Sequence, residues 1–378
     1  MPRDHGYHLL DGLRGVAALV VAILHLPRVF PGMSVPNAHL AVDFFLQLSG
    51  FVVAHAYTER VAGGLPLKDF IAVRVARLFP AYLIGLILGV GVAVLAVVFS
   101  GNGLSINWSA GKLACVSVFN LFMLPQIGCS SEKVLFPLNP PMWSIFFELL
   151  MGFVFFALCV WRLNGKSIFL LMIVSGAAMI PLTGFETLDV GFAWSNFIAG
   201  LFRVLFSFLV GIFIYKIHLK SNIRSDGLCY LVFLALAAAL LSQQRSFVYE
   251  VACVLVLFPA LLVAGAKLNP GSKFVSRLCA ESGKMSYVLY VIHKPLYQLC
   301  YGLLLKFSPS VIEKGGLLVG LSMLLVFVLI SWAGAVWYEP PMRRWMSSWM
   351  LRRKTRLERP AAIPADLQDG MEGANRSR

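Results

Sequence analysis

The apolar stretch from Leu10 to Leu26, LDGLRGVAALVVAILHL, is long enough to cross a membrane, yet it carries ionisable side chains. Arg14 and His25 are eleven positions apart, or about three helical turns, so both lie on nearly the same face, roughly 16 Å apart. Asp11 lies three residues before Arg14 and can reach it. A charge inside a spanning helix costs about 2.5–3.5 kcal/mol. The pattern indicates either a polar path inside a helical bundle or a snorkelling arginine with a histidine capping the far end.

The composition excludes an ordinary soluble globule. The chain is 59% hydrophobic and 13% charged, with a mean hydropathy of +0.79, which is typical of a polytopic membrane protein. We see no cleavable signal peptide, so the first apolar segment is expected to remain as a span. The net charge of +14 indicates basic cytoplasmic loops rather than nucleic-acid binding. The seven cysteines show neither a CxxC motif nor metal-ligand spacing, so no metal site is expected.

Ten apolar runs predict ten transmembrane helices, and an eleventh run, 112–124, is short and contains Asn120. The ten runs cover about 8–26, 40–57, 79–99, 142–161, 167–183, 197–215, 228–242, 247–266, 285–305 and 315–338. If the eleventh run does not cross, one side holds 23 Lys and Arg residues outside the spans and the other holds six. The positive-inside rule then predicts an all-α bundle with both termini in the cytoplasm.

This topology also predicts the domain organisation. Residues 1–345 form one membrane domain, and 346–378 form a basic cytoplasmic tail whose composition is typical of disorder. The segment 100–141 lies outside the cytoplasm, where an oxidising compartment would permit a disulfide between Cys115 and Cys129. We find no internal repeat and no hydrophilic stretch long enough for a second domain.

Polar residues punctuate the second run and the loop that follows it. In AVDFFLQLSGFV, Asp43 lies about level with His25, and a buried carboxylate needs a partner. Ser49 and Gly50 would let another helix approach closely. Arg74 and Arg77 share one face of a predicted interfacial helix. That pair either contacts anionic lipid or binds a phosphorylated ligand from the cytoplasm.

Two later runs carry further polar stripes. In PPMWSIFFE, Trp143 precedes Ser144 and Glu148, which lie on one helical face, and a glutamate at this depth should be paired, protonated or functional. The ninth run contains MSYVLYVIHKP, in which polar residues spaced by three form one stripe: Tyr287, Tyr290 and His293. The last span is predicted to end where Pro340 and Pro341 follow Glu339.

Together these motifs resemble acyltransferase family 3, the membrane-bound O-acyltransferases that modify bacterial cell-envelope glycans. The carrying features, in the family's order over about residues 8–345, are LDGLRGVAALVVAILH, VDFFLQLSGFV, RVARLFPAY, MWSIFFE, SYVLYVIHKP and YEPPMRR. One departure is the apolar IFF before Glu148, where many members have a more polar run. No room remains for the soluble esterase-like domain that some members carry, so the chain resembles a stand-alone transferase.

The resemblance implies transfer of an acyl group, usually acetyl from acetyl-CoA, to a sugar hydroxyl. The acceptor would belong to an envelope polysaccharide, such as lipopolysaccharide, or to a lipid-linked glycan. The protein would lie in the bacterial inner membrane among its lipids, with acyl-CoA as a co-substrate and no tightly bound cofactor. Arg14, Arg74 and Arg77 would bind the donor phosphates. His25 would act as general base, with Asp43 or Glu148 orienting the imidazole.

Other assignments stay open at this point. An acyl-histidine intermediate is an alternative to general-base catalysis. His293 is a further catalytic candidate, and the supporting set comprises Asp11, Ser49, Gly50, Trp143, Ser144, Tyr287 and Tyr290. The competing functions are a transporter or flippase that uses the same polar path, and a sensor that binds lipid or glycan without chemistry. The sequence names neither the acceptor, the acyl chain length nor the oligomeric state.

Overall fold

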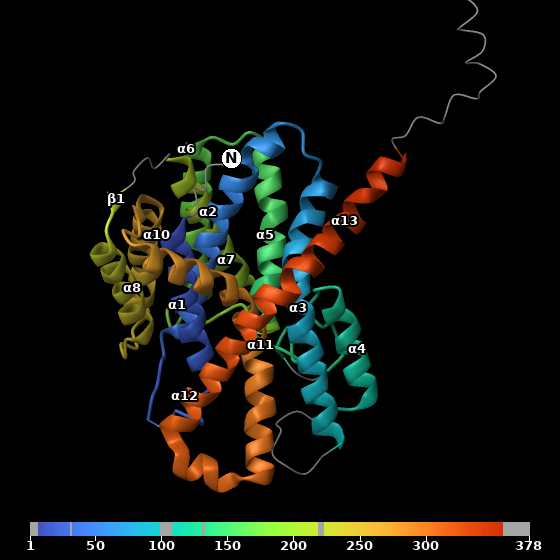
Figure 1. The fold of residues 1–378 in the computed structure, drawn as a ribbon. Coiled ribbons are helices and arrows are strands. Elements are labelled where there is room, and N and C mark those ends of the chain that lie inside the picture. Colours follow the sequence, from blue (N-terminus) through green and yellow to red (C-terminus); the bar gives the residue numbers. More distant parts are fainter. Residues whose placement is uncertain (1–6, 31, 99–107, 131–132, 218–222, 358–378) are drawn as a thin grey trace, which may run out of the picture.

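The computed structural model describes residues 7–30, 32–98, 108–130, 133–217 and 223–357. These residues form an all-α bundle (Figure 1), as predicted. Its helices are α1 (His8–Leu24), α2 (Ala41–Ala62), α3 (Leu67–Val98), α4 (Ala110–Leu121), α5 (Met142–Val160), α6 (Gly165–Leu182), α7 (Phe197–Lys216), α8 (Asp226–Leu241), α9 (Phe247–Ala252), α10 (Phe258–Lys267), α11 (Lys273–Phe307), α12 (Pro309–Ala333) and α13 (Glu339–Leu357).

Short irregular elements complete the chain. One-turn 3₁₀ segments, Ala38–Leu40 and Trp194–Asn196, precede α2 and α7. A π-helical turn, Cys253–Leu257, joins α9 to α10, and another, Gly334–Tyr338, joins α12 to α13. The two-residue strands β1 (Ile223–Arg224) and β2 (Leu268–Asn269) pair in parallel. In the described residues, strand content is therefore confined to connections.

Every predicted apolar run coincides with a helix or with joined helices. Eight of the helical segments are long and apolar enough to cross a membrane. The first and seventh runs correspond to α1 and α8, which are shorter, with 17 and 16 residues. The eleventh run corresponds to α4, whose 12 residues would extend about 18 Å, too short to span the hydrocarbon core. The orientation of the bundle stays a prediction from the loop charges.

The bundle has two distinct ends (Figure 1). We call the end that holds the start of α1 and the α2–α3 connection the N-terminal end. The opposite end holds the end of α1, the α11–α12 connection and the segment with α4. In that segment Cys115 and Cys129 form the disulfide that the sequence permitted. Its chain is joined to the α6–α7 connection, because Leu135 N–H donates to the Phe192 carbonyl at 2.9 Å.

Close packing of α2 against α7 depends on glycine. A Cβ atom on Gly50 would collide with the Phe208 carbonyl, and one on Gly211 would collide with the Gln47 carbonyl. Glycine at these two positions lets the backbones of α2 and α7 approach each other. This is the small-residue packing that Ser49 and Gly50 predict. Helix α1 packs against α11, α8 and α2, so the helix with the Arg14–His25 stripe lies inside the bundle.

Two sequence predictions about helix boundaries are wrong. Arg74 and Arg77 do not lie on a separate interfacial helix, because α3 runs without a break from Leu67 to Val98 and contains both. Pro340 and Pro341 do not stop the last helix either. They lie at the start of α13, directly after the π-helical turn Gly334–Tyr338, and the helix continues past them.

The helix α13 extends into the tail that the sequence predicts. It continues to Leu357, so residues 346–357 are helical rather than disordered. Residues 358–378, the remainder of the predicted tail, lie outside the described residues.

Candidate functional site

A cavity of about 860 Å³ lies between α1, α2, α3, α5, α11 and α13. It brings together most of the residues that the sequence singled out: Arg14, Ser49, Arg74, Arg77, Ser144, Glu148, Tyr287 and Tyr290. Six basic residues and two carboxylates line it, which gives the cavity a positive balance. At one end Arg343 and Arg344 are exposed, whereas Ser144 and Tyr290 at the other end are buried. We call this space the basic cavity.

Arg14 is held in place by α11 and by its own helix. Its Nε donates to Ser286 Oγ at 2.9 Å, and its Nη2 donates to the Gly283 carbonyl. Asp11 Oδ1 lies 3.7 Å from Arg14 Nη1, which confirms the contact that the three-residue spacing predicts. Arg14 therefore faces the cavity from a fixed position and is not a snorkelling side chain.

Glu148 is paired inside the cavity wall. Arg74 Nη2 donates to its Oε1 at 2.9 Å, and Ser49 Oγ donates to the same atom at 2.8 Å. Arg74 is only 1% exposed, so its charge faces the protein and not lipid headgroups. This contact satisfies the need for a partner that the sequence predicts for Glu148. It joins Glu148 to Arg74 and Ser49 and not to His25.

Arg77 differs from its neighbour. It lines the same cavity one helical turn along α3, and no hydrogen bond or ion pair holds its guanidinium within the described residues. Its partly exposed side chain is thus available to a ligand. Of the two arginines of the Arg-x-x-Arg pair, Arg74 has a positioning role and Arg77 is the free cation.

Tyrosines form the buried end of the cavity. Tyr290 Oη and Ser144 Oγ lie 2.7 Å apart, and both hydroxyls contact the Pro141 carbonyl at 3.2 Å. Tyr287 Oη donates to the Leu78 carbonyl at 2.8 Å. The ring of Tyr290 lies 6.0 Å from the ring of His293, centroid to centroid. The buried end of the cavity therefore adjoins His293.

His25 and His293 form a pair. His293 Nε2 lies 3.1 Å from His25 Nδ1, and the ring centroids are 4.9 Å apart. Each Nδ1 also lies 3.0 Å from the carbonyl four residues earlier, Val21 for His25 and Leu289 for His293. A carbonyl can only accept, so both Nδ1 atoms carry protons. His25 Nε2 is then left with its lone pair, the form that a general base requires.

Asp43 is buried away from the histidine pair. It is 0% exposed and accepts from Arg203, with Nη2 to Oδ2 at 2.6 Å and Nε to Oδ1 at 3.0 Å. Ser207 Oγ donates to Oδ1 at 3.0 Å. The Arg203 guanidinium lies 5.8 Å from the Trp143 ring, which is how Trp143 supports this region. The structure thus gives Asp43 a partner on α7 where the sequence analysis placed it beside His25.

Several basic residues of this region escaped the sequence analysis. Arg203 interrupts the apolar run 197–215. Because a charge inside a span requires a counter-charge, the sequence alone indicated that Arg203 has an acidic partner. Lys284, Arg343 and Arg344 line the basic cavity but resemble ordinary loop charges in the sequence. In the part of the chain that the structure describes, no group of three or more His, Cys, Asp or Glu side chains could hold a metal ion.

Comparisons with known proteins give this arrangement a family. A family model described as an acyltransferase domain matches residues 7–336. A curated protein from Rhizobium radiobacter, "Protein 2 in picA locus", is 36% identical over 152 residues, which is 39% of this chain and 79% of that protein. No solved structure matches the chain. The matched region includes both histidines and the cavity residues from Arg14 to Ala335, whereas the cavity residues from Glu339 to Ser347 lie beyond it. The chain belongs to acyltransferase family 3.

Proposed function

We propose that this membrane acyltransferase moves an acyl group, usually acetyl, from acyl-CoA to a sugar hydroxyl of an envelope polysaccharide or lipid-linked glycan. One observation carries the proposal. A single cavity begins at exposed arginines and ends at Tyr290, beside the His25–His293 pair. The basic residues therefore share one cavity with Tyr290, whose ring contacts His293, the partner of the candidate base.

The charge of the basic cavity suits a phosphorylated donor. Acyl-CoA carries phosphates at one end and the thioester at the end of a long flexible arm. Arg77, Arg343 and Arg344 would bind the phosphates, and each charge-assisted contact is worth about 1.5–3 kcal/mol. A volume of about 860 Å³ lies within the usual range of small-molecule sites, about 300–1,000 Å³.

The apolar cavity wall suits the arm of the donor. Phe45, Leu78 and Ile145 are among the side chains between the basic residues and the tyrosines. The arm would pass along them and place its thioester near the histidine pair. With the basic end in the cytoplasm, as the loop charges predict, the donor would enter from the compartment where acyl-CoA is made. This orientation would place the protein in the bacterial inner membrane.

The histidine pair suggests the chemical step. His25 Nε2 would take the proton of the acceptor hydroxyl while the hydroxyl oxygen attacks the thioester carbonyl. The C–S bond then breaks, a C–O ester bond remains on the sugar, and CoA leaves as a thiolate that takes the proton from His25. His293, whose Nε2 shares the His25 Nδ1 proton with the Val21 carbonyl, would stabilise the imidazolium. Attack by His25 itself, giving an acyl-histidine, is the alternative order of events.

Binding of CoA tests the donor half of this proposal. Isothermal titration of the full-length protein in detergent should show that Arg77→Ala weakens CoA binding by about tenfold or more. Arg77→Lys should restore only part of the CoA affinity, because lysine lacks the planar guanidinium that binds two phosphate oxygens at once. Arg277→Ala is the matched control, because Arg277 is an exposed arginine at the start of α11 and does not line the cavity.

Two outcomes would contradict the proposal. Unchanged CoA affinity in the Arg77→Ala protein would remove the basic cavity as the donor site. Tight CoA binding without thioester release on addition of glycan would favour a transporter or a sensor over an acyltransferase.

A further inference from the structure

A second pocket lies where α1 ends, and it is lined by residues from the connections that precede α2, α7 and α9. Its volume is about 480 Å³. Ile23, Leu24 and Pro27, which flank His25 in the chain, form part of its apolar wall. Asp189 also lies in the wall. We call it the His39 pocket, after the buried histidine that also lines it. The pocket wall thus includes residues on both sides of His25 in the chain.

His39 presents a buried polar atom, Nε2, that makes no hydrogen bond within the described residues. The residue is 8% exposed, and its Nδ1 donates to the Pro36 carbonyl at 2.8 Å. Its Nε2 has no hydrogen-bond partner and lies 3.5 Å from Glu250 Oε2, too long for a strong hydrogen bond. A buried polar atom without a partner is costly. Two neighbouring ligand hydroxyls could each donate a hydrogen bond here, one to Nε2 and one to the Glu250 carboxylate.

The other contacts of Glu250 fix its carboxylate. Thr187 Oγ1 donates to it at 3.1 and 3.2 Å, and the Leu188 N–H donates to Oε2 at 2.5 Å. Because these donors come from the α6–α7 connection, the carboxylate cannot turn freely away from His39. The pocket therefore offers a preformed pair of polar groups, as ligand sites commonly do.

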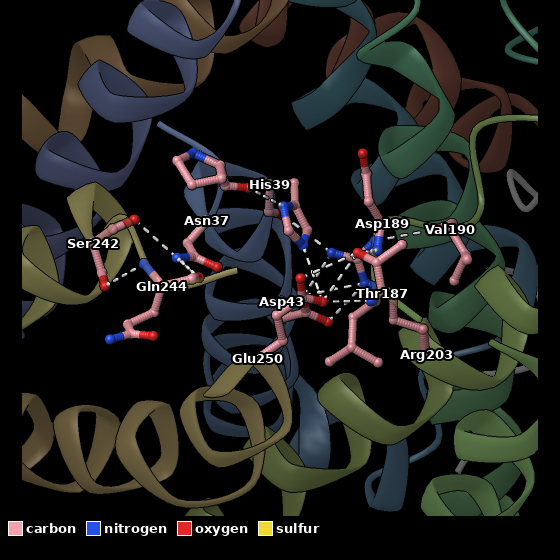
Figure 2. A network of polar contacts seen from close by, with 12 residues as sticks. Asn37, His39, Asp43, Thr187, Asp189, Val190, Arg203, Ser242, Gln244 and Glu250 are labelled. Atoms are coloured by element: carbon pink, nitrogen blue, oxygen red, sulfur yellow. Dashed lines mark hydrogen bonds and ion pairs between the residues drawn. The ribbon is translucent and has the colours of Figure 1, made fainter. Parts of the chain in front are cut away.

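The Asp43–Arg203 pair holds the walls of the pocket (Figure 2). Arg203 Nη2 donates to the His39 carbonyl at 3.1 Å, and Nη1 donates to the Val190 carbonyl at 3.0 Å. On the other side of His39 in Figure 2, Asn37 Nδ2 donates to the carbonyls of Ser242 and Gln244 at 2.9 and 2.8 Å. Three separate connections are thus tied together around His39.

The charge of the His39 pocket differs from that of the basic cavity. Its described lining contains the carboxylates of Glu186, Asp189 and Glu250 and one arginine, Arg245. Neither Glu186 nor Asp189 has a hydrogen bond or ion pair to its carboxylate in the described residues. Such groups accept from hydroxyls and repel anions. The combination of an apolar wall with acceptor groups suits a sugar that carries no negative charge.

We propose that the His39 pocket binds the acceptor sugar, that His39 and Glu250 contact its hydroxyls, and that it selects uncharged over acidic sugars. This proposal rests on the proposed function, since it places the acceptor across His25 from the donor. It adds the class of acceptor and the residues that recognise it.

Saturation-transfer NMR on the full-length protein in detergent tests the pocket directly. The probes are the methyl glycosides of glucose, galactose, mannose and rhamnose, with methyl glucuronoside as the acidic counterpart of the first. We expect a saturation-transfer signal from at least one neutral glycoside. The glucuronoside should bind about tenfold more weakly than that glycoside. The variant His39→Asn keeps an amide near Nδ1 and removes Nε2, so it should lose about tenfold in neutral-glycoside binding.

Two matched variants separate recognition from packing. His39→Gln places its amide near Nε2 and should retain more binding than His39→Asn. His55→Asn changes an exposed histidine at the other end of α2 and should bind like the wild type. The absence of signal from all four neutral glycosides, equal signals in wild type and His39→Asn, or equal saturation by the glucuronoside would each overturn the proposal. CoA titration reads the donor site alone, so a failure there would count against the proposed function instead.

Discussion

Removing Asp43 should lower the stability of the fold and not only the rate of acyl transfer. Asp43 and Arg203 are both 0% exposed, and three N–H···O contacts of 2.6–3.1 Å join them. In Asp43→Ala the guanidinium would keep only two carbonyl acceptors, Val190 and His39, and no counter-charge. Breaking a buried ion pair on one side costs about 3–5 kcal/mol. Since Arg203 is fully buried, we expect the loss to fall in the upper part of that range.

A double-mutant cycle separates the ion pair from other effects of the mutation. Replacing both partners by apolar residues, in Asp43→Leu with Arg203→Met, removes the buried charge together with its partner and should cost less than Asp43→Leu alone or Arg203→Met alone. Ser207→Ala is a milder control that removes one hydrogen bond to Asp43, worth about 1 kcal/mol. Thermal unfolding of each variant in detergent, followed by a thiol-reactive dye, gives the comparison.

The refuting result is specific. If Asp43→Ala melts like the wild type but has lost acyl transfer, Asp43 acts in the chemistry, as the sequence motif alone suggested. If the double variant is no more stable than the worse single variant, the two residues are not coupled.

Three further predictions address the histidine pair, the topology and the disulfide. His293→Asn should lower turnover less than His25→Ala while leaving CoA affinity unchanged, because His293 adjoins the base without being it; a loss of CoA binding would place it in the donor site instead. A cysteine at Ala110, exposed in α4, should react with an impermeant maleimide in intact cells, whereas one at Lys166, exposed at the start of α6, should react only after lysis; the reverse pattern would invert the bundle. Cys115 and Cys129 should resist alkylation until a reductant is added, and labelling of both in untreated protein would show that the bond does not form in the cell.

The helices were predictable because apolar length is a local property of the sequence. Every one of the ten runs became helical, and the spacing of Arg14 and Asp11 gave a real contact. The same-face placement of Arg74 and Arg77 also holds, although they lie on α3 and not on a separate interfacial helix. Periodicity within one helix thus translated directly into which side chains face one cavity.

Partners across helices were not predictable in the same way. The sequence required a partner for Asp43 but could not name it, because the choice depends on how α2 and α7 pack. The level of Asp43 along the membrane suggested His25, whereas the close approach at Gly50 and Gly211 brings α7 and Arg203 against Asp43. Charge inside an apolar run was the available signal for Arg203.

Substitution of His25 tests the central claim most directly, since the account places this residue between donor and acceptor with a lone pair on Nε2. The measurement is release of free CoA from acetyl-CoA by purified protein supplied with envelope glycan, alongside CoA titration and a melting curve. Because a general base contributes about 10²–10⁴-fold to rate, His25→Ala should show no detectable turnover while it binds CoA and melts like the wild type. A folded His25→Ala protein that keeps near-normal turnover would contradict the account and move the search for the base to Glu148 and His293.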